Sequence, residues 1–175
     1  MFLNAQNKQT AWEIVKPLRE LGIPTAAIVD IDFIKDGGQV FTKPLDSAFI
    51  PSLSHLSLHS QRQAIHSALI ATGKDMKKDG GILILDVAGQ EATNNFFDLL
   101  EEYGSFVVRN GELENWFKPL GANGHGSNWL IDIFEKMGDN PDDPTYVKPA
   151  NGDVWDFMGK IKYWMDNQNR KGIPR

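Results

Sequence analysis

The 175-residue sequence contains no cysteine, so disulfide scaffolds, thiolate metal sites and cysteine nucleophiles are all excluded. No apolar run approaches the roughly 18 residues that a membrane-spanning helix needs. The N-terminal stretch has no basic segment followed by an apolar one, so we expect no secretory signal peptide. Basic residues do not predominate either, because 18 Lys and Arg face 23 Asp and Glu; this excludes a strongly basic coat for nucleic acid and leaves only local DNA contacts. Together these absences predict a cytoplasmic protein without membrane contact.

Hydrophobic periodicity divides the chain into helices and strands. Apolar residues three or four positions apart, such as Trp12, Val15 and Leu18, mark one face of a helix. Helices are predicted over residues 10–21, 59–72, 90–103, 126–137 and 153–167. Short apolar runs predict a strand buried on both faces over residues 25–29, a second buried strand over 82–85 and a third strand over 105–108. The stretch 33–54, with two glycines and two prolines, is expected to form a loop, and 74–81 a solvated turn.

This alternation predicts an α/β fold. Strands that are separated by helices pair in parallel and are covered by helices on both faces, which gives a Rossmann-like, mostly parallel sheet. Hydrophobic residues make up 41% of the chain and charged residues 23%, as in ordinary globular domains. We expect one domain over residues 1–175, with a sheet core over about 1–115 and a helical C-terminal extension over about 116–175.

An acidic pair, Asp30 and Asp32, follows the first predicted strand. Ligands of open α/β sheets bind at the carboxyl ends of the strands. Side chains two apart on an extended chain point to the same side, and two such carboxylates repel each other unless a cation lies between them. Mg²⁺ suits this arrangement, since one or two carboxylates and water hold it. The alternative is that both acids merely end the strand and cap the next segment.

A second acidic pair, Glu112 and Glu114, follows the strand predicted at 105–108. Taken alone, these charges favour the positive end of a short helix over residues 112–118. Two carboxylate pairs on neighbouring strand ends are also the arrangement that holds two metals for phosphodiester cleavage. His55 and His59 stand four residues apart, but without cysteine ligands they indicate a solvated helix face rather than a zinc site.

The order of these motifs resembles a known family. The segment LRELGIP over residues 18–24, a buried strand and then Asp30-Ile31-Asp32 resemble the central part of a TOPRIM domain. The later order is similar to the TOPRIM nucleases of the OLD (overcoming lysogenization defect) family, in which an acidic pair lies near a G-x-L-E-like segment and a lysine follows. Here the matching features are the segment GELE over residues 111–114 and Lys148.

The resemblance implies a Mg²⁺- or Mn²⁺-dependent DNA nuclease with a TOPRIM-like fold, usually placed after an ABC-type ATPase domain in one long chain. It implies that Asp30 and Asp32 bind one metal and that Glu112 and Glu114 contribute to a second, with Glu114 also counted as catalytic. Lys148 would stabilise charge on the scissile phosphate, with Lys160 as a weaker candidate. A role in defence against phage follows from the family alone, and homo-oligomerisation stays open.

One family feature is missing. TOPRIM domains open with a strand that ends in a glutamate, and no such strand precedes residues 1–7, which resemble the second strand of the family; Glu13 lies inside a predicted helix. No Walker A motif is present either. We therefore expect a C-terminal piece of a longer protein or a reduced homologue without cleavage activity. The alternative to a nuclease is a non-catalytic TOPRIM-like module that docks an ATPase partner or DNA.

Overall fold

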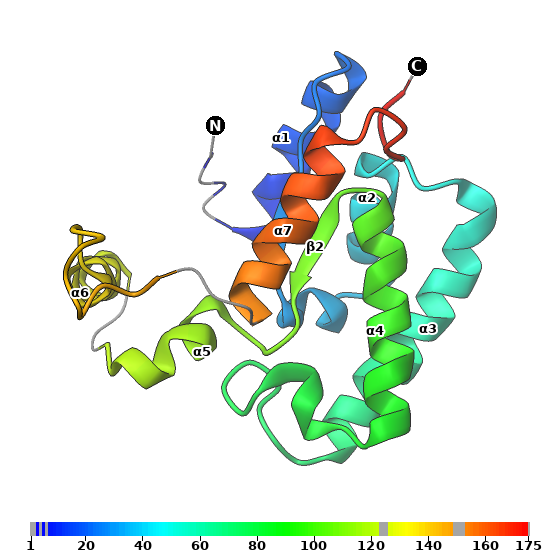
Figure 1. Cartoon of the computed structure of the whole chain (residues 1–175). Coiled ribbons are helices and arrows are strands. Elements are labelled where there is room, and N and C mark those ends of the chain that lie inside the picture. Colours follow the sequence, from blue (N-terminus) through cyan, green and yellow to red (C-terminus); the bar gives the residue numbers. More distant parts are fainter. Residues whose placement is uncertain (1–2, 4, 6, 123–125, 149–152, 175) are drawn as a thin grey trace.

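A two-stranded parallel sheet lies at the centre of the molecule, with helices on both of its faces (Figure 1). The structure is a computed structural model that describes residues 3, 5, 7–122, 126–148 and 153–174. The predicted α/β class is confirmed, although the described residues form two strands and not the three that the sequence pattern indicates. Among these residues, no helix combines the length and the apolar character that crossing a lipid bilayer requires.

The two strands are far apart in the chain. Strand β1 (Ala27–Asp30) pairs with β2 (Ser105–Val108) so that Ala27 faces Ser105 and Asp30 faces Val108. Parallel strands need a long crossover, and here helical segments supply it. The crossover contains η1 (Ile31–Lys35), α2 (Gly38–Ser47), α3 (Ser52–Ala71), η2 (Gly81–Ile84) and α4 (Val87–Glu102). This pairing brings the exits of β1 and β2 to one edge of the sheet.

Helix α1 (Lys8–Glu20) precedes the sheet and confirms the helix predicted near residues 10–21. Its start is fixed by Asn7, whose side chain accepts hydrogen bonds from the first free N–H groups. Pro17 lies inside the helix and does not end it. The helix ends before Gly22, whose φ of 75° suits glycine and lets its N–H donate back to the carbonyl of Arg19.

The alternating side chains of β2 divide the interior into two cores. Val107 points into the larger core, formed with α1, α2, α3 and α4. Phe106 and Val108 point the opposite way and pack under α7 (Asp153–Asp166) against Phe157 and Trp164. Strand β2 confirms the strand predicted at 105–108, and all four of its residues are buried.

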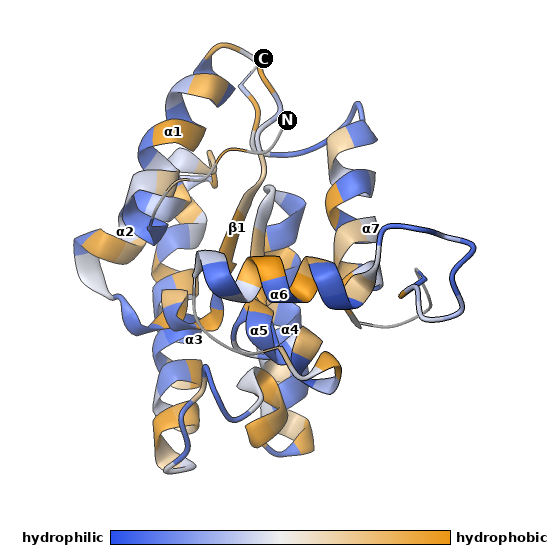
Figure 2. Cartoon of the chain, turned by 90° about the vertical axis from the view of Figure 1, so that its left-hand side faces the viewer, coloured by the Kyte–Doolittle hydropathy of each residue, from blue (hydrophilic) through white to orange (hydrophobic). Residues whose placement is uncertain are grey.

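The remaining helices extend from the exit of β2. They are α5 (Leu113–Phe117), η3 (Lys118–Leu120) and α6 (Ser127–Met137). In Figure 1, α6 stands to one side of the sheet and of the helices that cover it. Figure 2 shows apolar positions along α6, which include the exposed Leu130 and Phe134. Trp129 packs against Phe117, with ring centroids 6.0 Å apart, and so joins α6 to α5.

Three local predictions were wrong. Residues 82–84 lie in the 3₁₀ helix η2, with Leu85 as its C-cap residue, and form no strand, because Gly80 and Gly81 have φ values of 110° and 64° and turn the chain. A side chain at Gly81 would place its Cβ 1.9 Å from the carbonyl oxygen of Arg109, so only glycine allows this approach. The stretch 33–54 contains η1 and α2 and not an open loop, and Pro44 lies inside α2. Strand β1 is covered on one face only, since Ile28 is 44% exposed.

A buried arginine holds the C-terminal segment against the rest of the molecule. The guanidinium of Arg19 is fully buried and donates hydrogen bonds to five carbonyl oxygens, those of Thr25, Ala48, Tyr103, Gly104 and Gly172. It also lies 5.1 Å from the ring centre of Trp164. Burial lowers the pKa of Arg19 to about 10. The carbonyls of Ala48 and Tyr103 stand at the C-terminal ends of α2 and α4, where the helix dipole favours a cation.

Candidate acidic site at the carboxyl edge of the sheet

Carboxylates follow both strands at the edge where the strands end. Asp30 is the last residue of β1, and Glu112 is the N-cap residue of α5, shortly after β2. The two exits are joined directly, because the N–H of Ile31 donates to the carbonyl of Gly111 over 3.1 Å. The strand pairing therefore brings together two acids that are far apart in sequence, at the edge of the sheet where ligands of α/β folds bind.

A lysine lies between these two carboxylates. The Nζ of Lys77 is 2.8 Å from Oδ2 of Asp30 and 3.7 Å from Oε2 of Glu112. All three side chains are partly buried, with 28%, 38% and 22% of their surfaces exposed respectively. Burial opposes protonation of Lys77, but its hydrogen bond to Asp30 and the charges of Asp30, Asp32 and Glu112 outweigh that effect and raise its pKa. Lys77 lies in the stretch 74–81, whose polar composition predicts a solvated turn and gives no sign of a site residue.

The backbone of Lys77 is fixed on both sides. Its N–H donates to Oδ1 of Asp75 over 2.8 Å, a bond that lowers the pKa of Asp75. Its carbonyl accepts a hydrogen bond from Nδ2 of Asn115 over 2.5 Å. Gly111, with a φ of 114°, packs so closely here that an added Cβ would lie 2.1 Å from the same carbonyl oxygen. The segment that carries Glu112 therefore also holds Lys77 in place.

Asp32 belongs to a different ion pair from Asp30. It lies in η1 and not on the extended strand, so the alternation of an extended chain does not govern its direction relative to Asp30. The Nζ of Lys8, at the start of α1, lies 3.7 Å from Oδ2 of Asp32 and 2.9 Å from Oδ2 of Asp36, and it donates to the carbonyl of Asp32. Each exit of the sheet is thus lined with acids that are neutralised by lysines from elsewhere in the chain.

The site offers two carboxylates as oxygen donors. Asp30 and Glu112 both lie within 4 Å of one ammonium group, so their carboxylates already share a single cation. Mg²⁺ is held by one or two carboxylates together with water, which matches this pair of oxygen ligands. Across the described ranges, however, no group of three or more acidic or histidine side chains is close enough to hold a metal.

The other predicted site residues do not all join this pair. Glu114 is in the first turn of α5, half-buried, two residues after Glu112. Lys148 is exposed in the segment after α6 and, within the part of the chain that the structure describes, forms no ion pair with the four predicted acids. The structure therefore brings Asp30 and Glu112 together, places Asp32 beside them on Lys8, and leaves Lys148 apart from that contact.

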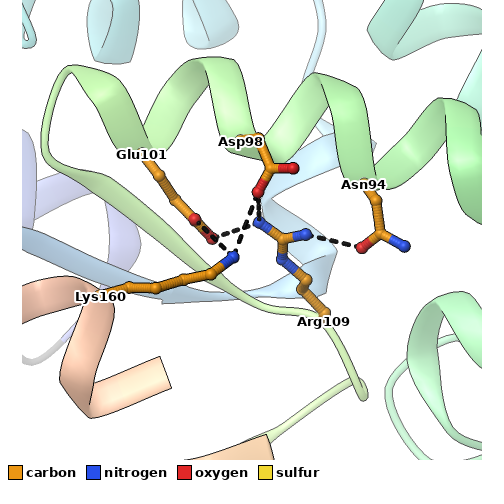
Figure 3. A network of polar contacts seen from close by, with 5 residues as sticks. All are labelled: Asn94, Asp98, Glu101, Arg109 and Lys160. Atoms are coloured by element: carbon orange, nitrogen blue, oxygen red, sulfur yellow. Dashed lines mark hydrogen bonds and ion pairs between the residues drawn. The ribbon is translucent and has the colours of Figure 1, made fainter. Parts of the chain in front are cut away.

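Lys160, the weaker lysine candidate, belongs to a second polar network (Figure 3). Its Nζ lies 3.2 Å from Asp98 and 3.0 Å from Glu101, both on α4. Arg109, directly after β2, contacts the same two acids and donates to Oδ1 of Asn94. Burial disfavours the charged form of Asp98, but the hydrogen bond and charge of Arg109, and then those of Lys160, lower its pKa. This network ties the exit of β2 to α4 and so positions the segment that leads to Glu112.

The histidine pair on α3 is structural. His55 lies 2.9 Å from the carbonyl oxygen of Ile50, and His59 lies 3.0 Å from Oγ1 of Thr42 and meets the ring of Phe41 edge-on. Both are half-buried, so the predicted solvated face is partly covered.

Comparison of the chain with protein-family models, with curated proteins and with solved structures finds no match in any of the three. The assignment of a function therefore depends on the residues and geometry of the acidic site and on the motif resemblance described above.

Proposed function

We propose that this chain is a Mg²⁺-dependent nuclease domain that hydrolyses phosphodiester bonds of DNA, of the OLD-like TOPRIM type. The observation that carries the proposal is the position of Asp30 and Glu112, which follow two hydrogen-bonded parallel strands and share one cation. The D-x-D and GELE segments that suggest the family thus meet at one edge of the sheet. Mn²⁺ would serve in place of Mg²⁺, since both take carboxylate and water ligands.

Each acid has a defined part in this function. Asp30 and Glu112 would hold the metal, which would supply a Lewis acid that activates water and stabilises charge on the phosphate. Asp32 keeps negative charge beside the site while Lys8 fixes its backbone. Glu114, at the start of α5, contributes to a second metal or to proton transfer. Lys148, being exposed, is free to approach the phosphate of a bound strand.

The proposal also includes partners. DNA is the substrate, and an ABC-type ATPase domain, in the same longer chain or in a separate subunit, would deliver it to the site. A chain with more acidic than basic residues does not bind DNA through its overall charge. A bound divalent cation would reverse the local potential of the acidic edge and permit phosphate to approach.

A non-catalytic binding module is the second candidate, and one observation favours it. Lys77 and Lys8 already neutralise Asp30, Glu112 and Asp32, so these acids are satisfied without any metal. In that function the ion pairs connect the two strand exits, and the module docks an ATPase partner or DNA.

Metal binding and DNA cleavage, measured on the same samples, separate the two candidates. Mn²⁺ titration by calorimetry and cleavage of plasmid DNA in Mg²⁺, Mn²⁺ or EDTA would be compared for the wild type, Asp30→Asn and Glu112→Gln. Glu13→Gln is the matched control, because Glu13 is an exposed acid that pairs with Lys43 on another surface. The nuclease proposal expects saturable Mn²⁺ binding and metal-dependent cleavage, both lost in the two site variants and kept in the control. Binding without cleavage favours the module, and equal weak binding in all four proteins refutes the metal site.

A further inference from the structure

We propose that the corner between η1 and α2, closed by Arg62 of α3, is a binding site for a phosphate-type oxyanion. The corner follows directly after the exit of β1, and ligands of α/β folds bind beyond the ends of such strands. This inference needs no metal and does not depend on the proposed function.

Arg62 is a buried arginine that lacks a carboxylate partner in the part of the chain that the structure describes. Only 8% of its surface is exposed. Among the described residues, its hydrogen bonding is limited to Nη1, which donates to the carbonyl of Ile34 over 2.8 Å, while Nε is buried without a partner. The guanidinium also lies 5.7 Å from the ring centre of Phe41. A guanidinium has several donors and is almost never buried unpaired, so Arg62 is a cation that still needs acceptors.

The N-terminus of α2 lies against this guanidinium. Helix α2 is ten residues long and follows Gly37, and none of the described side chains caps it. A Cβ built on Gly37, where a capping side chain would start, would lie 3.3 Å from Nη2 of Arg62. Gly38 has open space at its own Cβ position, and both glycines are exposed, so a ligand can enter from solvent. The free N–H groups of a helix start and a guanidinium are both donors that suit phosphate.

The charges around the corner favour an anion. Burial first, and then the positive charges of the guanidinium and of Lys35, lower the pKa of His66, one turn further along α3. Asp36, directly before the corner, is already paired with Lys8 at 2.9 Å. Asp75 is near enough to Lys35 for that lysine to contribute to its lowered pKa. A bound anion would offset the excess positive charge beside His66 and should therefore raise the pKa of this histidine.

The test is a titration of the 175-residue chain with inorganic phosphate, by calorimetry and by thermal unfolding, against sodium chloride at the same ionic strength. We expect saturable binding and a rise in melting temperature that sodium chloride does not reproduce. Arg62→Met keeps an apolar stem beside Phe41 and should bind phosphate at least about tenfold more weakly, because charged hydrogen bonds are lost. Arg170→Met is the matched control, since it makes the same change at the end of α7, and it should bind as the wild type does.

A second variant, Gly37→Asp, supplies the anion from within the chain and keeps the test decisive if Arg62→Met does not fold. The backbone of Gly37 is extended, so other residues can adopt it. The new carboxylate would cap α2 and pair with Arg62; the melting temperature should rise without phosphate, and the response to phosphate should disappear. Gly37→Asn gives the same cap without the charge and should raise the melting temperature less.

Competition against inorganic phosphate distinguishes the sources of the phosphoryl group. A nucleoside monophosphate that competes better than an oligonucleotide with a terminal phosphate indicates a small nucleotide, and the reverse order indicates a strand end. Equal phosphate affinity in the wild type and in Arg62→Met would overturn the inference, as would a rise in melting temperature that sodium chloride reproduces. A pKa of His66 that NMR finds unchanged at saturating phosphate would place the anion elsewhere and would also overturn it. The nuclease proposal is tested separately, by metal binding and cleavage.

Discussion

Replacement of Arg19 by methionine should destabilise the protein by about 2–4 kcal/mol, because a buried hydrogen-bond network loses its central donor. The guanidinium is fully buried and donates to five carbonyl oxygens. Gly104 keeps a second donor, the N–H of Ala27, so four carbonyls lose the bond that Arg19 supplies. Leaving a buried acceptor without its donor costs about 1–3 kcal/mol, or roughly 2–6 kcal/mol for the buried carbonyls of Ala48 and Gly172, and the partly buried carbonyls of Thr25 and Tyr103 add a smaller cost.

Two effects of the methionine side chain offset part of this loss of stability. Burial lowers the pKa of Arg19 from 12.5 to about 10, so the charged form carries a desolvation cost of about 3 kcal/mol that methionine avoids. Methionine also keeps most of the apolar stem in contact with the core. The net loss is a large part of the roughly 5–15 kcal/mol that stabilises a typical domain.

Urea unfolding, followed by tryptophan fluorescence and circular dichroism, measures this effect. Arg170→Met is the matched control, because its guanidinium lies 5.8 Å from the ring centre of the same Trp164 but donates to only two carbonyls, at the end of α7. We expect a loss of about 1 kcal/mol for that control. Arg19→Lys should reduce the free energy of unfolding almost as much as Arg19→Met. The planar guanidinium has five donors that reach carbonyls on several sides, whereas the compact ammonium of lysine has three donors on one atom. A loss below about 1 kcal/mol for Arg19→Met would show that the hydrogen bonds of Arg19 do not stabilise the protein as argued.

Three further predictions follow from the same structure. Gly111→Ala should cost at least about 2 kcal/mol in urea unfolding, because φ is 114° and the new Cβ would lie 2.1 Å from the carbonyl oxygen of Lys77; an unchanged midpoint would contradict that close contact. The ion pair with Arg109 lowers the pKa of Asp98, so its stabilisation is present above the ordinary pKa near 4 and is lost as the pH falls through the lowered value. Asp98→Asn should therefore flatten the decline of the melting temperature between about pH 5 and pH 2, and an identical pH profile would show that the pair contributes nothing. Phe106→Ala should cost about 3–5 kcal/mol, since Phe106 is 1% exposed between β2 and α7, and a loss under 1 kcal/mol would mean that α7 is not held there.

The carboxylates of the site could be found from the sequence, whereas their partners could not. Asp30 and Glu112 were identifiable because each follows a short apolar run, and the ends of parallel strands meet at one edge. Lys77 carries no such signal, since it lies in a polar, glycine-containing stretch that is typical of an exposed turn. Its ammonium reaches the acids only because Gly111 and Asn115 hold its backbone beside the exit of β2.

The sequence by itself determined the α/β class, the positions of β1 and β2, and the long helices, because the period of apolar residues is a local property of the chain. Only the tertiary structure decided that the apolar run at 82–85 becomes a 3₁₀ helix, since Gly81 must approach the carbonyl of Arg109. It also decided that Arg19 is buried among carbonyls and that Lys77 lies between two acids. These contacts join residues from distant parts of the chain, and their energies depend on burial and on the geometry of partners that no local pattern encodes.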